Sequence, residues 1–439
     1  MEFYKVPVVT KVNKDKLISV NVPGSKSITN RALLIAAMAD GTSLLKGCLF
    51  SDDSKYFLDC LNTLGFETIA NEETGDVSIT GMGGKVPNKN AEIYVGSAGT
   101  AARFLVAMLA FSDGEYLVNS SEQMKKRPMM PLIETLRNAG AEIICTEEEG
   151  HFPLKIKGVG DVNKIPDNIT VDIDKSSQFL SALLIAAGTL NREISIKIIG
   201  SHGLAYVDMT VSMMKDFGVN VVKEETEEIV YCLNGKDSYV PKTYNVEPDM
   251  SAAAYFYGLA AVTGAGVVVP GVFEDMLQGD VDFIDVLANM GCITENTDIG
   301  IVLQGPEDGR LEGDFEIDMS SFSDQALTLA AIAPYAEGEI TISGISHIRL
   351  QECDRVNAIR ENLKVLGVET VEEENSITIY PSQPHGGEIE TYDDHRVAMA
   401  FSLTGLRTEG VTILNPGCCR KTFKEYFNVL DNVITQLEN

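Results

Sequence analysis

A single pattern recurs six times along the sequence, and it constrains the fold more than any other feature. A polar loop leads into an alanine-rich apolar helix, and a β-branched segment follows. The six loops begin at Gly24, Gly96, Lys175, Pro248, Phe322 and Asp393. Their spacing of roughly 70–80 residues exceeds that of solenoid repeats, so each copy predicts a small subdomain.

A second helix is expected in each copy. Five of these second helices end in a hydrophobic residue, a glycine and the start of a strand, with the glycines at Gly65, Gly140, Gly218, Gly291 and Gly367. A glycine just past a helix end predicts a left-handed cap. Each unit is therefore expected to hold a strand, a buried helix, a strand, an amphipathic helix and a strand pair. The first helices are apolar nearly all round, which predicts that they are buried.

The number of units predicts the number of domains. A chain of 439 residues is too long for one ordinary core, and six units favour two domains of three. The expected N-terminal three-unit domain covers residues 23–245, and the second three-unit domain begins at residue 246. The fold class is α/β (α+β).

Composition narrows the class of function. The net charge of −29 repels polyanions, which argues against a nucleic acid or an anionic membrane as partner. The first residues lack the apolar stretch of a signal peptide, and glycines and Pro270 interrupt the longest apolar run, so a cytoplasmic protein is expected. The eight cysteines include no CxxC and the five histidines are scattered, which favours a reduced protein without a metal site.

In so acidic a chain, the basic residues of the loops need a reason. Lys26 and Arg31 lie at the expected start of the first apolar helix, where the helix dipole favours anions. An anionic ligand held between them and the backbone N–H groups would explain them. An ordinary capped helix with basic side chains in solvent is the alternative, and this stretch alone does not decide.

The later loops repeat this ambiguity. Hydroxyls such as Ser176 and Ser177 either cap a helix or cradle a phosphate, and Asp324 is either a cap or a base. Glu352 and Arg355, three residues apart, form a surface ion pair by default. Pro128 fits the first position of a helix over 129–138, directly after three cations. If the buried helices run parallel, their N-termini together predict a positive cleft for a small, multiply anionic substrate.

These loops resemble the 3-phosphoshikimate 1-carboxyvinyltransferase (EPSP synthase) family of enolpyruvyltransferases across essentially the whole chain. The matching segments, in the family's order, are PGSKSITNR, GSAGTAAR, KRPMMPL, SSQFLSALL, VEPDMSAAAYF, SDQALT, RLQECDR, YDDHR and CRKTF. The resemblance implies two domains, each an inside-out α/β barrel of three βαβαββ units (EPT/RTPC-like), with the active site in the cleft between them. It also implies that the strand over 17–20 closes the C-terminal domain, which is therefore expected to cover residues 1–22 plus 246–439.

The resemblance further implies a reaction. The enolpyruvyl group of phosphoenolpyruvate moves to the 5-hydroxyl of shikimate 3-phosphate and phosphate is released, in the shikimate pathway to aromatic amino acids. The implied enzyme is a monomer that uses these two small molecules and needs no metal or organic cofactor. It is also a target of glyphosate.

Roles for individual residues follow from the matching motifs. The implied catalytic residues are Lys26, Asp324, Glu352 and His395, with Asp324 taking the proton of the 5-hydroxyl and Glu352 protonating the methylene carbon. Shikimate 3-phosphate would be held by Lys26, Ser27, Arg31, Ser176, Ser177, Gln178, Tyr206, Asp324 and Gln351. Phosphoenolpyruvate would be held by Lys26, Gly99, Arg127, Gln178, Arg355, Arg396 and Lys421.

The sequence departs from the family at some contacts. Gly203 and Leu204 stand where the family usually has a basic residue and a proline, Gln351 stands where a lysine often contacts the phosphate, and His347 where an asparagine often lies. A related enzyme acting on UDP-N-acetylglucosamine would need a cysteine near the KKRP segment, and none lies between Cys60 and Cys145. A non-catalytic anion sensor with this fold is the remaining alternative.

Overall fold

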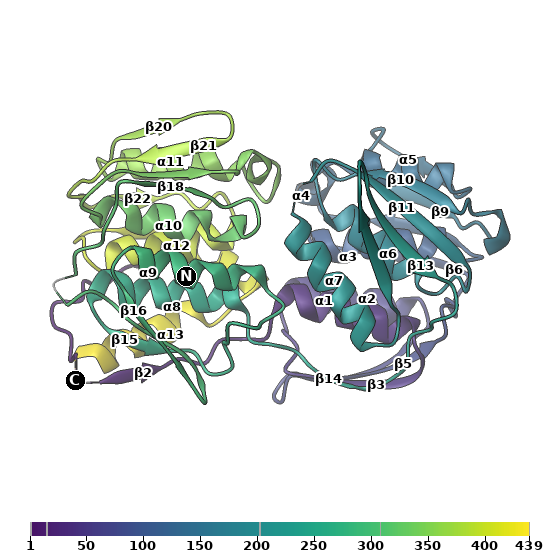
Figure 1. Ribbon diagram of the computed structural model, residues 1–439, viewed down its shortest axis with the longest axis horizontal. Helices are drawn as coiled ribbons and strands as arrows, with labels where there is room; N and C mark the ends of the chain where they lie inside the picture. The colour runs from purple at the N-terminus through teal and green to yellow at the C-terminus, as the bar shows by residue number, and fades with distance from the viewer. Residues whose placement is uncertain (1, 15, 202, 308, 439) are drawn as a thin grey trace. The chain divides into compact units, whose positions relative to one another are not determined.

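The computed structural model describes residues 2–14, 16–201, 203–307 and 309–438. Contacts between Cα atoms divide the chain into two compact units. The N-terminal unit is Gly24–Val246, and the C-terminal unit combines Met1–Pro23 with Glu247–Asn439 (Figure 1).

Three four-stranded sheets form the outside of the N-terminal unit, and all share one pairing order. In each sheet, one parallel pair of strands is followed by two antiparallel pairs, because each of the three repeats ends in a β-hairpin. The sheets are β14 (Thr243–Asn245), β3 (Asp40–Lys46), β5 (Asp76–Met82), β4 (Glu67–Asn71); β6 (Asn90–Tyr94), β7 (Glu115–Asn119), β9 (Leu154–Lys157), β8 (Glu142–Cys145); and β10 (Asn168–Asp172), β11 (Glu193–Ile199), β13 (Ile229–Asn234), β12 (Val221–Glu225).

The apolar helices of this unit lie inside the sheets. The three inner helices, α1 (Lys26–Met38), α3 (Gly99–Ala110) and α6 (Gln178–Ala187), contact one another pairwise and are buried along almost their whole length. The second helices are α2 (Asp52–Thr63), α5 (Met130–Asn138) and α7 (Leu204–Asp216), with a short α4 (Glu122–Lys125) before α5. The expected burial of the first helices is confirmed.

The C-terminal unit repeats this plan with one difference. Its sheets are β2 (Leu17–Ser19), β15 (Gly266–Val268), β17 (Gly300–Gln304), β16 (Ile293–Thr297); β18 (Phe315–Asp318), β19 (Ile340–Ser343), β21 (Ser376–Ile379), β20 (Thr370–Glu372); and β1 (Phe3–Lys5), β23 (Thr412–Leu414), β22 (Glu388–Ile389). The last sheet has three strands in the described part of the chain and lacks the expected strand pair; β1 pairs antiparallel with β23 there.

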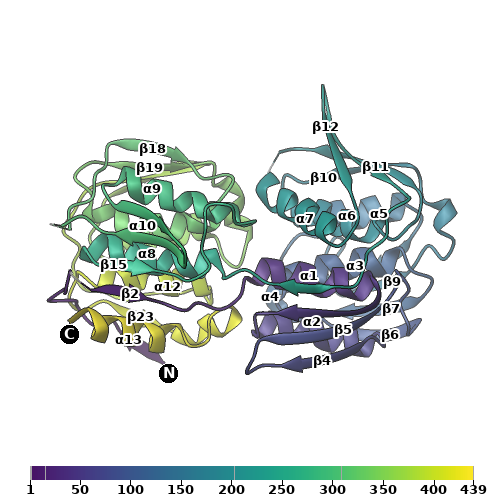
Figure 2. The same cartoon turned by 60° about the horizontal axis from the view of Figure 1, so that its bottom comes forward.

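The helices of the C-terminal unit also form an inner and an outer set. The inner helices α8 (Met250–Thr263), α10 (Ala326–Ile332) and α12 (His395–Gly405) contact one another at the centre of the unit (Figures 1 and 2). The second helices are α9 (Phe283–Asn289), α11 (Arg355–Val365) and α13 (Tyr426–Glu438). Short 3-10 turns precede the inner helix α10 and the three second helices: η2 (Gly279–Asp282), η3 (Ser323–Gln325), η5 (Ser346–Leu350) and η6 (Pro416–Lys421).

Strand β2 shows how the chain start is used. It pairs in parallel with β15, with Ile18 opposite Val267, so it completes a sheet of the C-terminal unit as the family resemblance implies.

The expected helix after the KKRP segment begins later than predicted. Helix α5 starts at Met130, so Pro128 lies ahead of the helix and its predicted place at the first helical position is wrong. Pro131, in the first turn, meets the preference for proline instead.

The predicted glycine caps are confirmed. Gly65, Gly140, Gly218, Gly291 and Gly367 have φ values of 90°, 102°, 98°, 93° and 78°.

In the described part of the chain, no helix is both long enough and apolar enough to cross a membrane.

Gly140 gives a direct test of these caps. A Cβ added there would meet only Val159, at 3.7 Å, so Gly140→Ala should act through backbone strain alone. We expect the free energy of unfolding to fall by about 1–2 kcal/mol in urea titrations. Gly140→Asn is the control and should lose less, because asparagine tolerates left-handed backbone. Equal losses for both would contradict the strain explanation.

Candidate active site

The first turns of the inner helices of the C-terminal unit meet in one polar cluster. Asp324 lies in η3, just before α10, and Arg396 lies in the first turn of α12. Arg355 begins α11, whereas Glu352 lies in the loop before it and Lys421 ends η6. The side chains of all five are largely buried, which places a dense set of charges in a region of low dielectric.

Arg355 is at the centre of this cluster. Its guanidinium donates to Asp394 at 2.8 Å, to Asp324 at 2.9 Å and to Glu352 at 2.9 Å. Burial opposes the charge of Arg355, but the three carboxylates outweigh it and raise its pKa well above the ordinary value. Glu352 and Arg355 were expected to form a surface ion pair; the pair is buried, because the other carboxylates draw the guanidinium inward.

Asp324 bridges two arginines. One carboxylate oxygen lies 2.9 Å from Nη1 of Arg355 and the other 2.7 Å from Nη2 of Arg396. Burial opposes the charge of Arg396, but Asp324 outweighs it, and the pKa of Arg396 is raised. Asp324 caps neither η3, whose N-cap is Phe322, nor α10. The capping interpretation of Asp324 is therefore wrong.

Glu352 bridges two cations in the same way. Its carboxylate contacts Nη2 of Arg355 at 2.9 Å and Nζ of Lys421 at 3.2 Å. Gln351 joins the cluster through its side-chain oxygen, which accepts from Nη1 of Arg355. The structure thus brings together six of the predicted site residues in this unit: Asp324, Gln351, Glu352, Arg355, Arg396 and Lys421.

Asp394 supports this cluster, and the sequence analysis did not single it out. It is fully buried, accepts from Nε of Arg355, and caps α12 by accepting from the backbone N–H of Arg396 at 2.8 Å. His395 follows it, with Nδ1 3.6 Å from the Asp394 carboxylate and only 1% of the residue exposed. An aspartate before an apolar helix looks like a simple cap, so its bond to Arg355 carries no sequence signal of its own.

The N-terminal unit places a second group of predicted residues at the first turns of its inner helices. Arg31 donates to the carbonyls of Ser27 and Tyr206 and to Oγ1 of Thr210, and it stacks 5.6 Å from the ring centre of Phe104. Burial lowers its pKa to about 10. Two of its donors therefore join α1 to α7, and the third bonds within α1.

Lys26 and the loop before α3 complete this side. Nζ of Lys26 lies 3.8 Å from the buried carboxylate of Asp53, a second acid that the sequence analysis missed. Gly99 starts α3 beside the half-buried Arg127, and a Cβ on Gly99 would stand 2.4 Å from Nη1 of that arginine. Only a glycine leaves the Arg127 guanidinium in this position.

Of the two hydroxyls before α6, only that of Ser176 bonds to a backbone N–H of the helix. Ser177 is the N-cap of α6 but makes no capping hydrogen bond, and Ser176 accepts from the N–H of Gln178 at 3.3 Å. Gly203, which starts α7 with φ of 64°, lies against Ser177, because an added Cβ would be 2.7 Å from its hydroxyl. Tyr206 is half-buried in the first turn of the same helix.

Known structures share this architecture. The enolpyruvyl transferase NikO from Streptomyces tendae aligns with a TM-score of 0.74 over 98% of this chain and 97% of that chain, at 14% identity, which shows the fold alone. An EPSP synthase from Acinetobacter baumannii aligns with a TM-score of 0.80 over 98% and 97% of the two chains, at 28% identity. The fold is thus that of a two-domain enolpyruvyltransferase.

Sequence comparisons narrow the class. The sequence profile of EPSP synthase (3-phosphoshikimate 1-carboxyvinyltransferase) matches residues 14–430. A 3-phosphoshikimate 1-carboxyvinyltransferase of Trichormus variabilis is 40% identical over 98% of this chain and 99% of its own length, and one of Nostoc punctiforme is 38% identical over 99% and 100%. The chain belongs to the EPSP synthase family.

The role of Asp394 as the buried partner of Arg355 can be tested by stability. Asp394→Ala should lower the free energy of unfolding by about 3–5 kcal/mol, because a buried arginine loses a charged partner. Asp354→Ala is the matched control, since Asp354 also caps a helix but is exposed; its loss should be about 1 kcal/mol. Similar losses in urea titrations of the two variants would show that Asp394 is only a cap.

Proposed function

We propose that the protein transfers the enolpyruvyl group of phosphoenolpyruvate to the 5-hydroxyl of shikimate 3-phosphate and releases phosphate. The observation that carries the proposal is the arrangement of Asp324 and Glu352, each held between two buried cations. Two carboxylates beside a set of arginines and a lysine suit a reaction that moves protons on a multiply anionic substrate. Membership of the EPSP synthase family supports the same reaction.

The cations of both units would bind the substrates. Arg355, Arg396 and Lys421 from the C-terminal unit and Arg127 from the N-terminal unit would grip the carboxylate and phosphate of phosphoenolpyruvate, with Gly99, Lys26 and Gln178. Shikimate 3-phosphate would be held by the hydroxyls of Ser27, Ser176 and Ser177, by Tyr206 and Gln351, and by Arg31. Arginine suits this task because its planar fork matches carboxylate and phosphate groups.

Binding and proton transfer are linked through the same cations. In the structure, the carboxylates of Asp324 and Glu352 accept hydrogen bonds from the guanidinium and ammonium groups that phosphoenolpyruvate would bind. An incoming anion competes for these cations and leaves the two carboxylates less well paired. A carboxylate that loses its cation holds a proton more tightly, which prepares Asp324 to accept one and Glu352 to carry one.

The reaction then balances in two steps. In the addition, Glu352 gives a proton to the methylene carbon of phosphoenolpyruvate, the 5-oxygen attacks the adjacent carbon, and Asp324 takes the hydroxyl proton. In the elimination, Glu352 takes a proton back from the new methyl group, the bond from carbon to the phosphate oxygen breaks, the vinyl double bond re-forms, and Asp324 returns its proton to the departing phosphate. Nearby carboxylates stabilise the cationic character that develops at the central carbon. Lys26 and His395 complete the proposed catalytic set.

The remaining proposals concern the protein's binding partners, its location in the cell, its oligomeric state and its inhibition. Its partners are these two small molecules, and the net charge of −29 disfavours nucleic acid and anionic membranes. We propose a cytoplasmic monomer that glyphosate inhibits.

The deciding experiment measures phosphate release with phosphoenolpyruvate and either shikimate 3-phosphate or UDP-N-acetylglucosamine. Release with shikimate 3-phosphate alone is expected. Release only with the nucleotide sugar would assign the other enolpyruvyl transfer, and release with neither would favour an anion sensor.

Replacing Glu352 tests its part in proton transfer. Glu352→Gln keeps the shape of the side chain but cannot donate an acidic proton, so kcat should fall by about 10²–10⁴-fold while KM changes little. The control is Glu361→Gln in α11, where the carboxylate pairs with Arg360 at the surface. A loss that appears equally in KM and kcat would remove Glu352 from the chemical step.

Gly99→Ala tests the contact with Arg127. The added Cβ would displace the guanidinium, so the KM for phosphoenolpyruvate should rise about tenfold, and the inhibition constant of glyphosate should rise too. The KM for shikimate 3-phosphate is the internal reference and should stay within about twofold. An increase confined to shikimate 3-phosphate would place Arg127 at the other substrate.

A further inference from the structure

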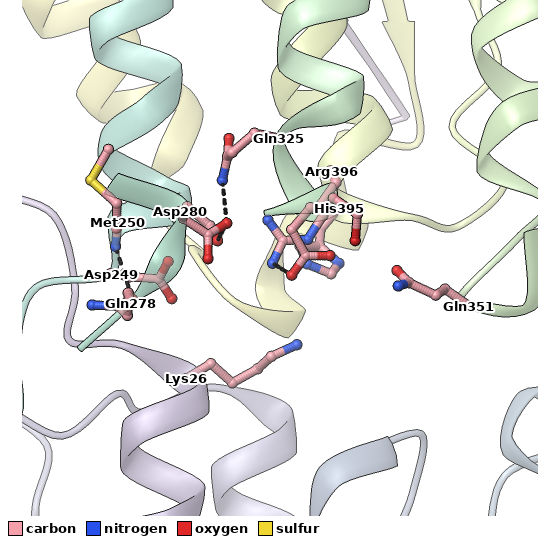
Figure 3. A network of polar contacts seen from close by, with 12 residues as sticks. Lys26, Asp249, Met250, Gln278, Asp280, Gln325, Gln351, His395 and Arg396 are labelled. Carbon is pink, nitrogen blue, oxygen red and sulfur yellow. Dashed lines mark hydrogen bonds and ion pairs between the residues drawn. The ribbon is translucent and has the colours of Figure 1, made fainter. Parts of the chain in front are cut away.

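A buried carboxylate that the proposed mechanism does not use lies beside Asp324. Asp280 belongs to η2, is 3% exposed, and accepts from Nε2 of Gln325 at 2.8 Å and from Oγ of Ser251 at 3.2 Å (Figure 3). Both donors are neutral side chains. A buried carboxylate with only neutral donors is costly to keep ionised, so its presence needs a reason.

The charged groups around Asp280 come from the starts of the three inner helices of this unit, or from the turn just before them. Asp324 faces it from η3, Arg396 from α12 and Asp249 from the N-cap of α8. Burial and then the charge of Asp324 raise the pKa of Asp280 to about 6, although Arg396 and the bond from Gln325 act in the opposite direction. Asp280 is therefore ionised above about pH 6 and neutral below it.

The position of Asp324 explains what a second carboxylate could do. Asp324 is held between Arg355 and Arg396, and two cations at 2.9 Å and 2.7 Å make a carboxylate a poor proton acceptor. A like charge nearby has the opposite effect and strengthens the base. Asp280 supplies such a charge without a direct bond to either arginine.

We propose that Asp280 is a positioning residue whose negative charge strengthens Asp324 as the base of the reaction. This role rests on the proposed function of Asp324. Asp280 also acts through geometry, because Gln325 directly follows Asp324 and its amide is fixed at both ends, by Asp280 and by Oγ1 of Thr328 at 3.1 Å. The turn that carries Asp324 is thereby held in place.

The test is the ratio of kcat in the wild type to kcat in Asp280→Asn, measured between pH 5 and pH 8. Asparagine keeps the shape and can still accept both hydrogen bonds, but it carries no charge. We expect a ratio of about five to ten at pH 8, falling toward one near pH 5, where Asp280 of the wild type is protonated. Taking the ratio cancels the titration of the substrate phosphates, which also occurs near pH 6.

Two controls separate this charge effect from a loss of structure. Asp282→Asn removes an exposed carboxylate from the same 3-10 turn and should give a ratio near one at every pH. The folded-state pKa of Asp280 is raised, so its ionisation opposes folding as the pH rises through about 6. The Tm of Asp280→Asn at pH 8 should therefore be no lower than that of the wild type.

Each remaining outcome overturns the role. A ratio that is large but independent of pH, together with a lower Tm, would make Asp280 a structural residue. A ratio near one at all pH values would show that the charge of Asp280 does not change the strength of Asp324 as a base. If the wild type releases no phosphate from phosphoenolpyruvate and shikimate 3-phosphate, the proposed function itself fails, and this role fails with it.

Discussion

The ion pairs of one buried arginine organise the C-terminal unit. Arg355 is 1% exposed, and Asp324, Glu352 and Asp394 reach it from three separate segments of the chain. A charge so far from water is tolerated only when carboxylates and hydrogen bonds surround it. Those carboxylates in turn fix the starts of α10, α11 and α12, so the polar end of the unit is set by one guanidinium.

This arrangement explains how a strongly acidic protein can bind small anions. The net charge of −29 is spread over the surface, whereas the cations gather at the first turns of buried helices. There the helix dipoles and the low dielectric strengthen each local charge. The protein's own carboxylates pair with these cations, and the same carboxylates are the proposed proton carriers.

Much of this could be predicted from the sequence because it depends on local rules. The glycine caps at Gly65 and Gly140 follow from backbone geometry, and the buried inner helices follow from their uniform apolarity. The loop carrying Arg396 departs from those rules, since a cation has the wrong sign for a helix N-terminus, whereas Asp324 looks like an ordinary cap in the sequence. The sixth sheet differed because its third strand, β1, comes from the other end of the chain.

The sequence by itself determined the repeating unit, the family and the residues that could carry the chemistry, because each depends on neighbours within a few positions. Only the tertiary structure decided which carboxylates meet which cations. Asp53, Asp280 and Asp394 look like ordinary caps or turn residues in the sequence. Their partners lie between 27 and 45 positions away, at Lys26, Gln325 and Arg355. Such pairs form only when the starts of the inner helices pack against the second helices or the turns before them. Burial then turns ordinary acids into groups that set the charge of the site.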